Sequence, residues 1–305
     1  MKFSGNIDEY KNQFIVPKST HEHIHVLKNM FYIEEFKFLL TQFPQGIDRK
    51  SIEEYCNIEM SHYEKLSWIR NELDRYSVKA EEEQLLEEIC TFIAQRIQPR
   101  KYVCYTNISA SLDTIAQEIL NSLRKKHPNH SIFFTSDETF SYWKTNNIED
   151  NHWNETESTQ IMDTLQEYIF GTLNFRPCIS SPENIKYLCI DYVLQSKFGK
   201  DIIVYTIFHS VARRLGLRCD VRVLHIIDNF DIFWKPKFVT DNLENARKFY
   251  IKYKDYPNCH TDNRSLIWGR VLTTRKMLVY TTNIVAAFIK EHTYIIRALL
   301  LSGNN

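Results

Sequence analysis

The sequence contains little glycine: seven residues in a chain of 305, and no two of them lie close together. Loops that cradle phosphate groups need clustered glycines, because only then can the backbone approach the anion. The scarcity argues against a nucleotide-binding loop of that type. We therefore expect no cofactor.

The chain also lacks an excess of charge and a long apolar run. Lysine and arginine total 38, as do aspartate and glutamate, which removes the simplest electrostatic reason to expect nucleic acid. The longest apolar runs, such as 284–289, fall well short of the ~20 residues of a membrane span. The N-terminus carries early acidic residues and no apolar signal core. We expect a cytoplasmic or nuclear protein that contacts neither nucleic acid nor membrane.

Cysteine pairs with metal-binding spacing are absent as well. The seven cysteines are dispersed without a C-x-x-C motif, which is typical of reduced intracellular thiols. His21, His23 and His25 would share one face of a strand, but no cysteine or further histidine lies near them in the sequence. We interpret this segment as solvated and expect no metal site.

The first half of the chain does contain helical periodicity. Apolar residues recur at helical spacing in five segments: 26–42, a segment from near 48, 63–73, 81–97 and 113–126. Residues 131–155 are polar and aromatic, and we interpret them as an irregular connection.

The second half combines helices with short strands. Helices are expected at 160–173, 184–198, 201–216 and within 273–301, and strands at 220–226, 230–234 and 248–253. Arg213 and Arg214 end the helix 201–216, where basic residues suit the helix dipole. Asp201 should begin that helix and accept a hydrogen bond from a backbone amide two or three residues on. Val221 and Val223 should face it and pair with Phe230 or Ile232.

Three segments carry a resemblance to a known family. They read YIFGTLNF at 168–175, KFGKDI at 197–202 and VARRLGL at 211–217, and an aromatic strand ending in Phe233-Trp234 follows them. This order resembles the F-box only protein 21 family and its bacterial SirB-type relatives, which carry a transglutaminase-like domain. The Leu-Pro-rich F-box and the hemimethylated-DNA-binding-like domain of longer relatives are not expected here.

The resemblance implies a mostly helical α+β fold. Its transglutaminase-like, papain-like core would have a small antiparallel sheet packed on a central helix. We expect a lead-in at 1–25 and one region at 26–305, with the transglutaminase-like core at about 157–305.

The resemblance also implies a catalytic cysteine at a helix N-terminus, a histidine and an aspartate. The family spacing places these positions at Asp201, Asn229 and about Lys252. A carboxylate is a poor substitute for a thiolate, and an amide cannot shuttle a proton near neutral pH. His225 is a rival for the histidine position, and Asp255 is close enough to serve as the aspartate. We predict a degenerate triad and no catalytic residues.

Two alternatives to a catalytically inactive, partner-binding protein remain open. Cys90, Cys189 and Cys219 lie where free cysteine usually acts as a small buried hydrophobe. A rearranged pair of Cys189 with His209 would instead give a cysteine-dependent amide hydrolase or transferase. A substrate adaptor in ubiquitin-dependent turnover is implied by the family resemblance. The favoured hypothesis is a transglutaminase-like pseudoenzyme that binds a protein or peptide through the former active-site cleft.

Overall fold

The computed structural model describes residues 68–98, 101–178, 185–224, 229–240, 243, 245–249, 270–281 and 283. The chain divides into two compact units, Met1–Trp68 and Ile69–Asn305, and every described residue except Trp68 belongs to the second. The expected lead-in at 1–25 and the expected helices at 26–42 and near 48 lie outside the described residues.

Helix α9 (Asp201–Arg214) runs through the core of this unit. Its sequence DIIVYTIFHSVARR is apolar on nearly every side, and such a helix must be covered all round. Val204, Ile207 and Val211 have no exposed surface, and neither has Phe208, which stacks on Phe170 with 5.2 Å between ring centroids. The expected central helix is therefore confirmed.

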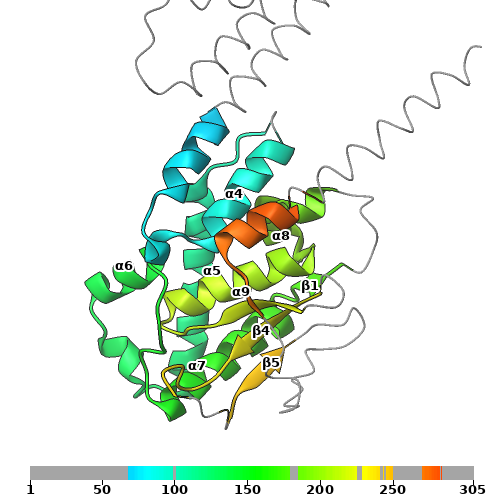
Figure 1. Ribbon diagram of the computed structural model, residues 1–305. Coiled ribbons are helices and arrows are strands. Elements are labelled where there is room, and N and C mark those ends of the chain that lie inside the picture. Colours follow the sequence, from blue (N-terminus) through cyan, green and yellow to red (C-terminus); the bar gives the residue numbers. More distant parts are fainter. Residues whose placement is uncertain are drawn as a thin grey trace, which may run out of the picture. The chain divides into compact units, whose positions relative to one another are not determined.

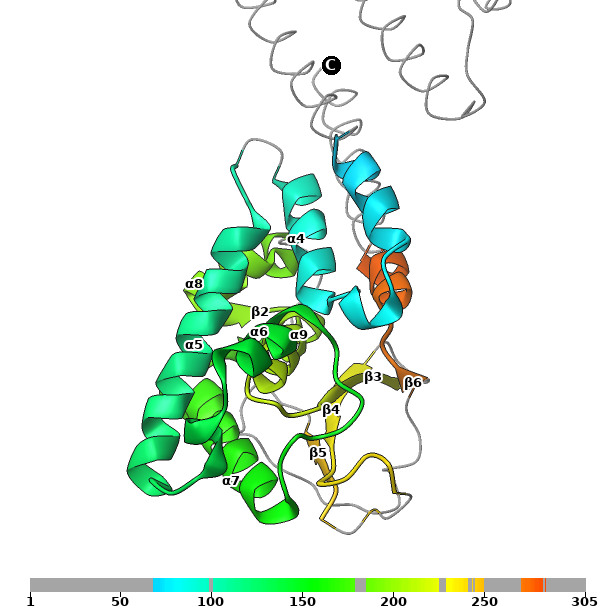
Figure 2. The same cartoon turned by 90° about the vertical axis from the view of Figure 1, so that its left-hand side faces the viewer.

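In chain order, the helical segments that precede α9 are residues 69–77, η1 (Glu81–Glu83), α4 (Leu86–Ile97), α5 (Tyr105–Lys126), η2 (Ser131–Phe134), α6 (Asp137–Thr145), α7 (Glu155–Gln166), the π-helix η3 (Glu167–Thr172), η4 (Ile185–Leu188) and α8 (Ile190–Ser196). Of these, α4, α5, α6 and α8 pack against α9 (Figures 1 and 2). Figure 2 shows α5 and α7 on one side of α9 and strands β3–β6 on the other.

A four-stranded antiparallel sheet forms the second layer, in the order β5-β4-β3-β6. The strands are β3 (Asp220–Leu224), β4 (Asn229–Trp234), β5 (Arg247–Phe249) and β6 (Arg270–Val271). Val221 pairs with Ile232 and Val223 with Phe230, as the alternation of the sequence predicts. Strands β1 (Arg176–Pro177) and β2 (Phe198–Gly199) form a separate parallel pair.

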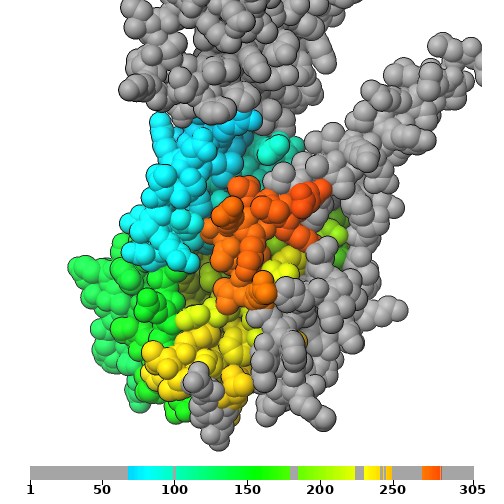
Figure 3. Space-filling view, in the orientation of Figure 1, coloured from blue at the N-terminus to red at the C-terminus, as the bar shows by residue number. Residues whose placement is uncertain are grey.

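A helical segment distant in sequence completes the core. Residues 274–281 are helical, which agrees with the expected C-terminal helix as far as it is described. Met277 is fully buried, and its Sδ lies 3.8 Å from the Sγ of Cys90 on α4. In Figure 3 this segment (orange) lies beside the first helix of the unit (cyan).

The expectation of an irregular connection at 131–155 is wrong for its centre. Ser136 accepts a hydrogen bond from the backbone amide of Thr139 and so begins helix α6. Trp143 of α6 is buried, and its ring lies edge-on to Trp153, with 5.5 Å between centroids. This short helix was missed because its apolar side consists of aromatic residues rather than a regular aliphatic stripe.

The observed architecture is a mostly helical α+β fold, as expected, with a small antiparallel sheet packed on α9. Among the described residues, no helix has the length and apolar character that a membrane crossing requires.

Candidate functional site

Asp201 begins α9, but its hydrogen bond differs from the expected one. Lys200 is the N-cap, and the Asp201 carboxylate accepts from the backbone amide of Ile202, one residue on, at 2.8 Å. The expectation of a bond two or three residues on is therefore wrong. Asp201 already has helical geometry, so its side chain cannot take the position of a true N-cap.

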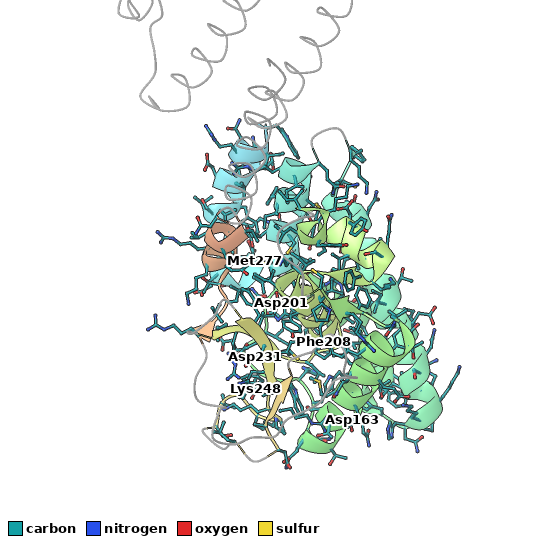
Figure 4. The ribbon with its side chains drawn as sticks, turned by 90° about the vertical axis from the view of Figure 1, so that its right-hand side faces the viewer. Asp163, Asp201, Phe208, Asp231, Lys248 and Met277 are labelled. Atoms are coloured by element: carbon teal, nitrogen blue, oxygen red, sulfur yellow. The ribbon has the colours of Figure 1, made fainter. Side chains whose placement is uncertain are left out.

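The surroundings of Asp201 connect it to the sheet. Burial raises the pKa of its carboxyl group, and hydrogen bonding to the backbone amide of Ile202, the charge of Lys200 and hydrogen bonding to the backbone of Phe230 partly oppose this effect. Phe230 follows Asn229 in β4. The first predicted triad position, Asp201, therefore lies beside the strand that carries the second predicted position, Asn229 (Figure 4).

The other predicted site residues are described only in part. Asn229 is the first residue of β4, and its backbone pairs with Leu224. The Asn229 side chain lies outside the described part of the structure, as do His225, Lys252 and Asp255. The degenerate triad at Asp201, Asn229 and Lys252 stays a prediction.

The thiols considered as rearranged nucleophiles are deeply buried. Cys90, Cys189 and Cys219 have no exposed surface, and burial raises the pKa of each, that of Cys189 to about 12. The Nδ1 atom of His209 lies against the carbonyl oxygen of Cys219, whereas the thiol of Cys189 contacts the carbonyl of Ile185 at 3.9 Å. Among the described residues, no hydrogen bond joins Cys189 to His209.

Sequence reasoning passed over Cys178, which lies near Asp201. Its backbone amide donates to the carbonyl of Gly199 at 2.7 Å, next to the parallel pair β1–β2. Burial raises the pKa of its thiol, Lys200 lowers it and Asp201 raises it, so both charges act on this sulfur. This neighbourhood depends on pairing between segments about 20 residues apart, and no local pattern in the sequence signals it.

Sequence reasoning also passed over Cys104, the N-cap residue of α5. A hydrogen bond with Thr106, whose Oγ1 lies 3.2 Å away, lowers the pKa of this partly exposed thiol. A signal was present in the sequence. Ile108 and Leu112 are in phase with Ile115 and Ile119, so the helix predicted from residue 113 could have been extended to residue 105.

Arg213 and Arg214 lie in the last turn of α9, as expected, and they also take part in a buried ion cluster. Both are buried and donate to the carboxylate of Glu87, which has no exposed surface and also accepts from Ser210 Oγ at 2.8 Å. Arg214 Nε donates to Asp113 at 2.8 Å. We call these five residues the Glu87 cluster. It joins α4, α5 and α9.

Burial alone would raise the pKa of Glu87, but the charges of Arg213 and Arg214 outweigh it and hold the pKa at about 2. Glu87 is therefore ionised at neutral pH. Because every member of the cluster is engaged by another part of the fold, we assign it a structural role.

A second buried ion cluster crosses the sheet. Asp231 of β4 has no exposed surface and accepts from Arg222 Nε at 2.9 Å and Nη2 at 3.0 Å, while Lys248 Nζ lies 3.3 Å away (Figure 4). Arg222 is the partner of Asp231 in the strand register. These contacts tie β3, β4 and β5 together on the face of β4 opposite Phe230 and Ile232.

Residues 106–224 match the family model of the transglutaminase-like superfamily, Transglut_core2. This segment is a transglutaminase-like superfamily domain. The match is to the superfamily and gives no support to the F-box only protein 21 family in particular. No curated protein and no solved structure matches the chain.

The transglutaminase-like segment begins at residue 106 in α5 and ends at residue 224, the last residue of β3. The core was expected to begin further along the chain, at about residue 157. The matched segment includes Asp201 and Cys178, whereas Cys104 lies two residues before it. Strand β4, with the second triad position, follows the matched segment and joins it through the ladder with β3.

Proposed function

We propose that this chain is a non-catalytic transglutaminase-like protein that binds a protein or peptide partner. The observation that carries the proposal is Asp201 at the start of α9, where the family spacing expects the nucleophilic cysteine. An ionised carboxylate accepts hydrogen bonds but offers no thiolate for acyl transfer.

The environment of Asp201 is suited to binding. The side chain is partly exposed, and it accepts hydrogen bonds from the backbone amide of Ile202 at 2.8 Å and from the backbone of Phe230, which together leave part of its acceptor capacity unused. A carboxylate with remaining acceptor capacity can receive an N–H group of a peptide, and such a bond is stronger than one between neutral groups. This chemistry supports recognition of a peptide at the former catalytic position.

The test is an assay for acyl transfer with the whole chain. We expect the wild-type protein not to incorporate a fluorescent primary amine into a glutamine-containing protein, and not to hydrolyse a glutamine amide, above the rate of the Asp201→Ala variant. Wild-type activity that disappears in one of the variants Cys104→Ser, Cys178→Ser or Cys189→Ser would show that a relocated thiol is catalytic.

A relocated thiol is the second candidate function, and the charge of Lys200, which lowers the pKa of the Cys178 thiol, favours it. Against it stands the raised pKa of Cys178, since the thiolate is the nucleophile. An adaptor role in ubiquitin transfer rests on the resemblance to the F-box only protein 21 family alone. A pull-down with the ligase scaffold subunit would test that role.

A further inference from the structure

A cavity of about 440 Å³ lies between α5, η3 and α8, away from Asp201. One wall is a stripe along α5 with residues at intervals of three or four: Cys104, Asn107, Ile108, Ser111, Thr114, Ile115 and Glu118. From residue 104 to residue 118 an α-helix rises ~21 Å. The cavity is therefore elongated along α5, and its volume is in the ordinary range of ligand sites.

The lining of this cavity mixes apolar and polar groups without net charge. Tyr168 of η3 and Leu173, which directly follows η3, line the cavity together with Leu194 and Gln195 of α8. Two lysines, Lys101 and Lys197, balance Glu118 and Asp191.

The charged groups of the cavity are largely engaged by the protein itself. Lys101 pairs with Asp191 at 2.5 Å, and the Lys197 ammonium donates to the carbonyl of Leu194. The exposed side-chain amides of Asn107 and Gln195 form no hydrogen bond with the described residues. They remain able to donate to and accept from a ligand.

The backbone around the cavity is irregular. The π-helix η3 ends with a bond from the Leu173 amide to the Tyr168 carbonyl at 2.8 Å. Asn174 and Lys197, which follow η3 and α8, have φ angles of 56° and 61°. π-helical turns and left-handed non-glycine residues both gather at functional sites. The backbone thus supports the choice of this cavity over others.

Cys104 lies at one end of the cavity. Helix α5 has 22 residues, no acidic residue in its first turn and no side-chain cap, so its N-terminal amides can stabilise a thiolate. Burial raises the pKa of the described thiols of Cys90, Cys178, Cys189 and Cys219, whereas that of Cys104 is lowered. Cys104 is therefore the described thiol best suited to attack an electrophile.

We propose that this cavity is a binding groove for an extended, uncharged peptide segment of about six residues, with Cys104 as a reactive thiol at its end. An extended chain of that length spans the ~21 Å of the groove at ~3.3–3.6 Å per residue. The amides of Asn107 and Gln195 can pair with its main chain, and Tyr168 and Leu194 can contact its side chains. The groove is a second binding site, away from Asp201, and it is independent of the peptide recognition proposed for Asp201.

The test uses Cys104 in the full chain as a reporter of binding. A mixture of uncharged hexapeptides capped with a chloroacetyl group is compared with chloroacetamide, which carries the same electrophile. The thiolate sulfur forms a bond to the methylene carbon, the carbon–chlorine bond breaks, chloride leaves, and the thiol proton passes to the buffer. Peptide mapping by mass spectrometry gives the rate at each cysteine.

We expect Cys104 to react faster with chloroacetamide than the other four described thiols. We expect the hexapeptide mixture to alkylate it at least tenfold faster than chloroacetamide, with saturation, because binding raises the effective concentration of the electrophile. Ser111→Trp should fill the middle of the groove and remove the peptide advantage without changing the chloroacetamide rate. Asn121→Trp, on the same helix but outside the groove, should change neither.

Three results would overturn the proposal. The first is alkylation of Cys104 by the hexapeptides no faster than by chloroacetamide, and the second is a rate advantage of the hexapeptides that survives Ser111→Trp. The third is a larger rate advantage for acidic or basic hexapeptides than for uncharged ones. Slow reaction of Cys104 with chloroacetamide would overturn the assignment of a reactive thiol. Amine transfer by the wild-type protein would contradict the proposed function, and the groove would still be judged by the alkylation rates alone.

Discussion

Glu87 is ionised and has no exposed surface, and two arginines compensate its charge in the folded protein. Arg213 and Arg214 both donate to its carboxylate, and Ser210 supplies a third bond. Removing one partner from a buried ion pair costs ~3–5 kcal/mol, because the other charge stays buried and uncompensated. We therefore expect Glu87→Gln to lower the free energy of unfolding by that amount in urea denaturation.

The matched control for Glu87 is the next residue. Glu88 pairs with Lys79 at 2.9 Å near the surface, so Glu88→Gln should cost no more than ~1 kcal/mol. Equal losses in the two variants would show that the Glu87 cluster is not the buried ion network described here.

The depressed pKa of Glu87 also predicts a pH dependence. The folded-state pKa of about 2 lies below the ordinary 4.5, so the stability that this carboxylate contributes is present above pH 4.5 and is lost as the pH falls toward 2. The difference in unfolding free energy between wild type and Glu87→Gln should shrink over that window. A difference that stays constant from pH 5 to pH 2.5 would contradict this assignment.

The pKa of Asp201 is shifted in the opposite direction to that of Glu87. Burial raises its folded-state pKa above the ordinary 3.8, so ionisation above that pKa costs the folded state free energy, and the cost is relieved as the pH falls through it. Asp201→Asn keeps an acceptor for the Ile202 amide and removes the charge. We expect it to be at least as stable as wild type at pH 7 and relatively less stable at pH 3.

A control variant separates charge from hydrogen bonding at Asp201. Asp201→Ala loses the acceptor as well, so it should be ~1 kcal/mol less stable than Asp201→Asn at pH 7. A marked loss of stability in Asp201→Asn at pH 7 would mean that the ionised carboxylate stabilises the fold.

At the scale of elements, α9 and strands β3 and β4 could be predicted because their sequences have one consistent period. The length and apolar character of 201–216 indicate a buried helix, and alternation at Val221 and Val223 sets the strand register. Helix α6 could not, since nine residues with aromatic contacts give no clear period. The role of Arg213 and Arg214 could not either, because their partner Glu87 is distant in sequence.

The sequence could predict which positions belong to the candidate site, but it could not predict which residues are their neighbours in space. The family spacing selected Asp201, which does begin a helix beside β4. Local sequence could not show that Cys178 lies near Asp201, because that neighbourhood is created by the parallel pairing of β1 and β2. Nor could it show that Cys104 borders a cavity, whose opposite wall comes from η3 and α8.

The turn after α9 provides a prediction at the scale of an element. Gly216 has a φ angle of +71°, and an added Cβ would lie 2.9 Å from the rings of both Trp143 and Trp153. A left-handed backbone costs a residue with a side chain roughly 1–2 kcal/mol before any clash. Gly216→Ala should therefore destabilise the protein by at least ~2 kcal/mol and alter its tryptophan fluorescence.

Gly171 is the matched control for Gly216. It is exposed in η3, and Gly216 is the described glycine with a positive φ. Gly171→Ala should change stability by no more than ~0.5 kcal/mol. Comparable effects of the two substitutions would argue against the tight packing of the turn on the two tryptophans.

At the scale of the whole molecule, the two predicted site positions come from different parts of the chain, one inside the segment that matches the superfamily and one outside it. The matched segment supplies α9 with Asp201, while β4 supplies position 229 from outside the match. The ladder between β3 and β4 holds these parts in one sheet, and the interaction of Asp201 with the Phe230 backbone joins helix to strand. The transglutaminase-like segment and β4 thus lie together at Asp201, the position where the family spacing expects a cysteine.

This arrangement predicts the outcome of restoring the catalytic pair. In Asp201→Cys alone, the introduced thiol has a helix N-terminus but no base, and its pKa should stay near the ordinary ~8.5 or fall slightly. In Asp201→Cys with Asn229→His, an imidazole beside the thiol should lower that pKa further. The rate of iodoacetamide alkylation at position 201, followed against pH, measures both values.

The fold should tolerate both substitutions, because Lys200 rather than Asp201 is the N-cap of α9 and Asn229 is the first residue of β4. Asp201→Cys with Asn229→Gln is the control, since glutamine lengthens the side chain without supplying a base. If the histidine and glutamine double variants share one alkylation profile, position 229 does not face position 201, and the comparison of Asn229 with the family histidine fails. If the histidine variant alone reacts at neutral pH, the site is a transglutaminase-like triad that Asp201 and Asn229 keep inactive.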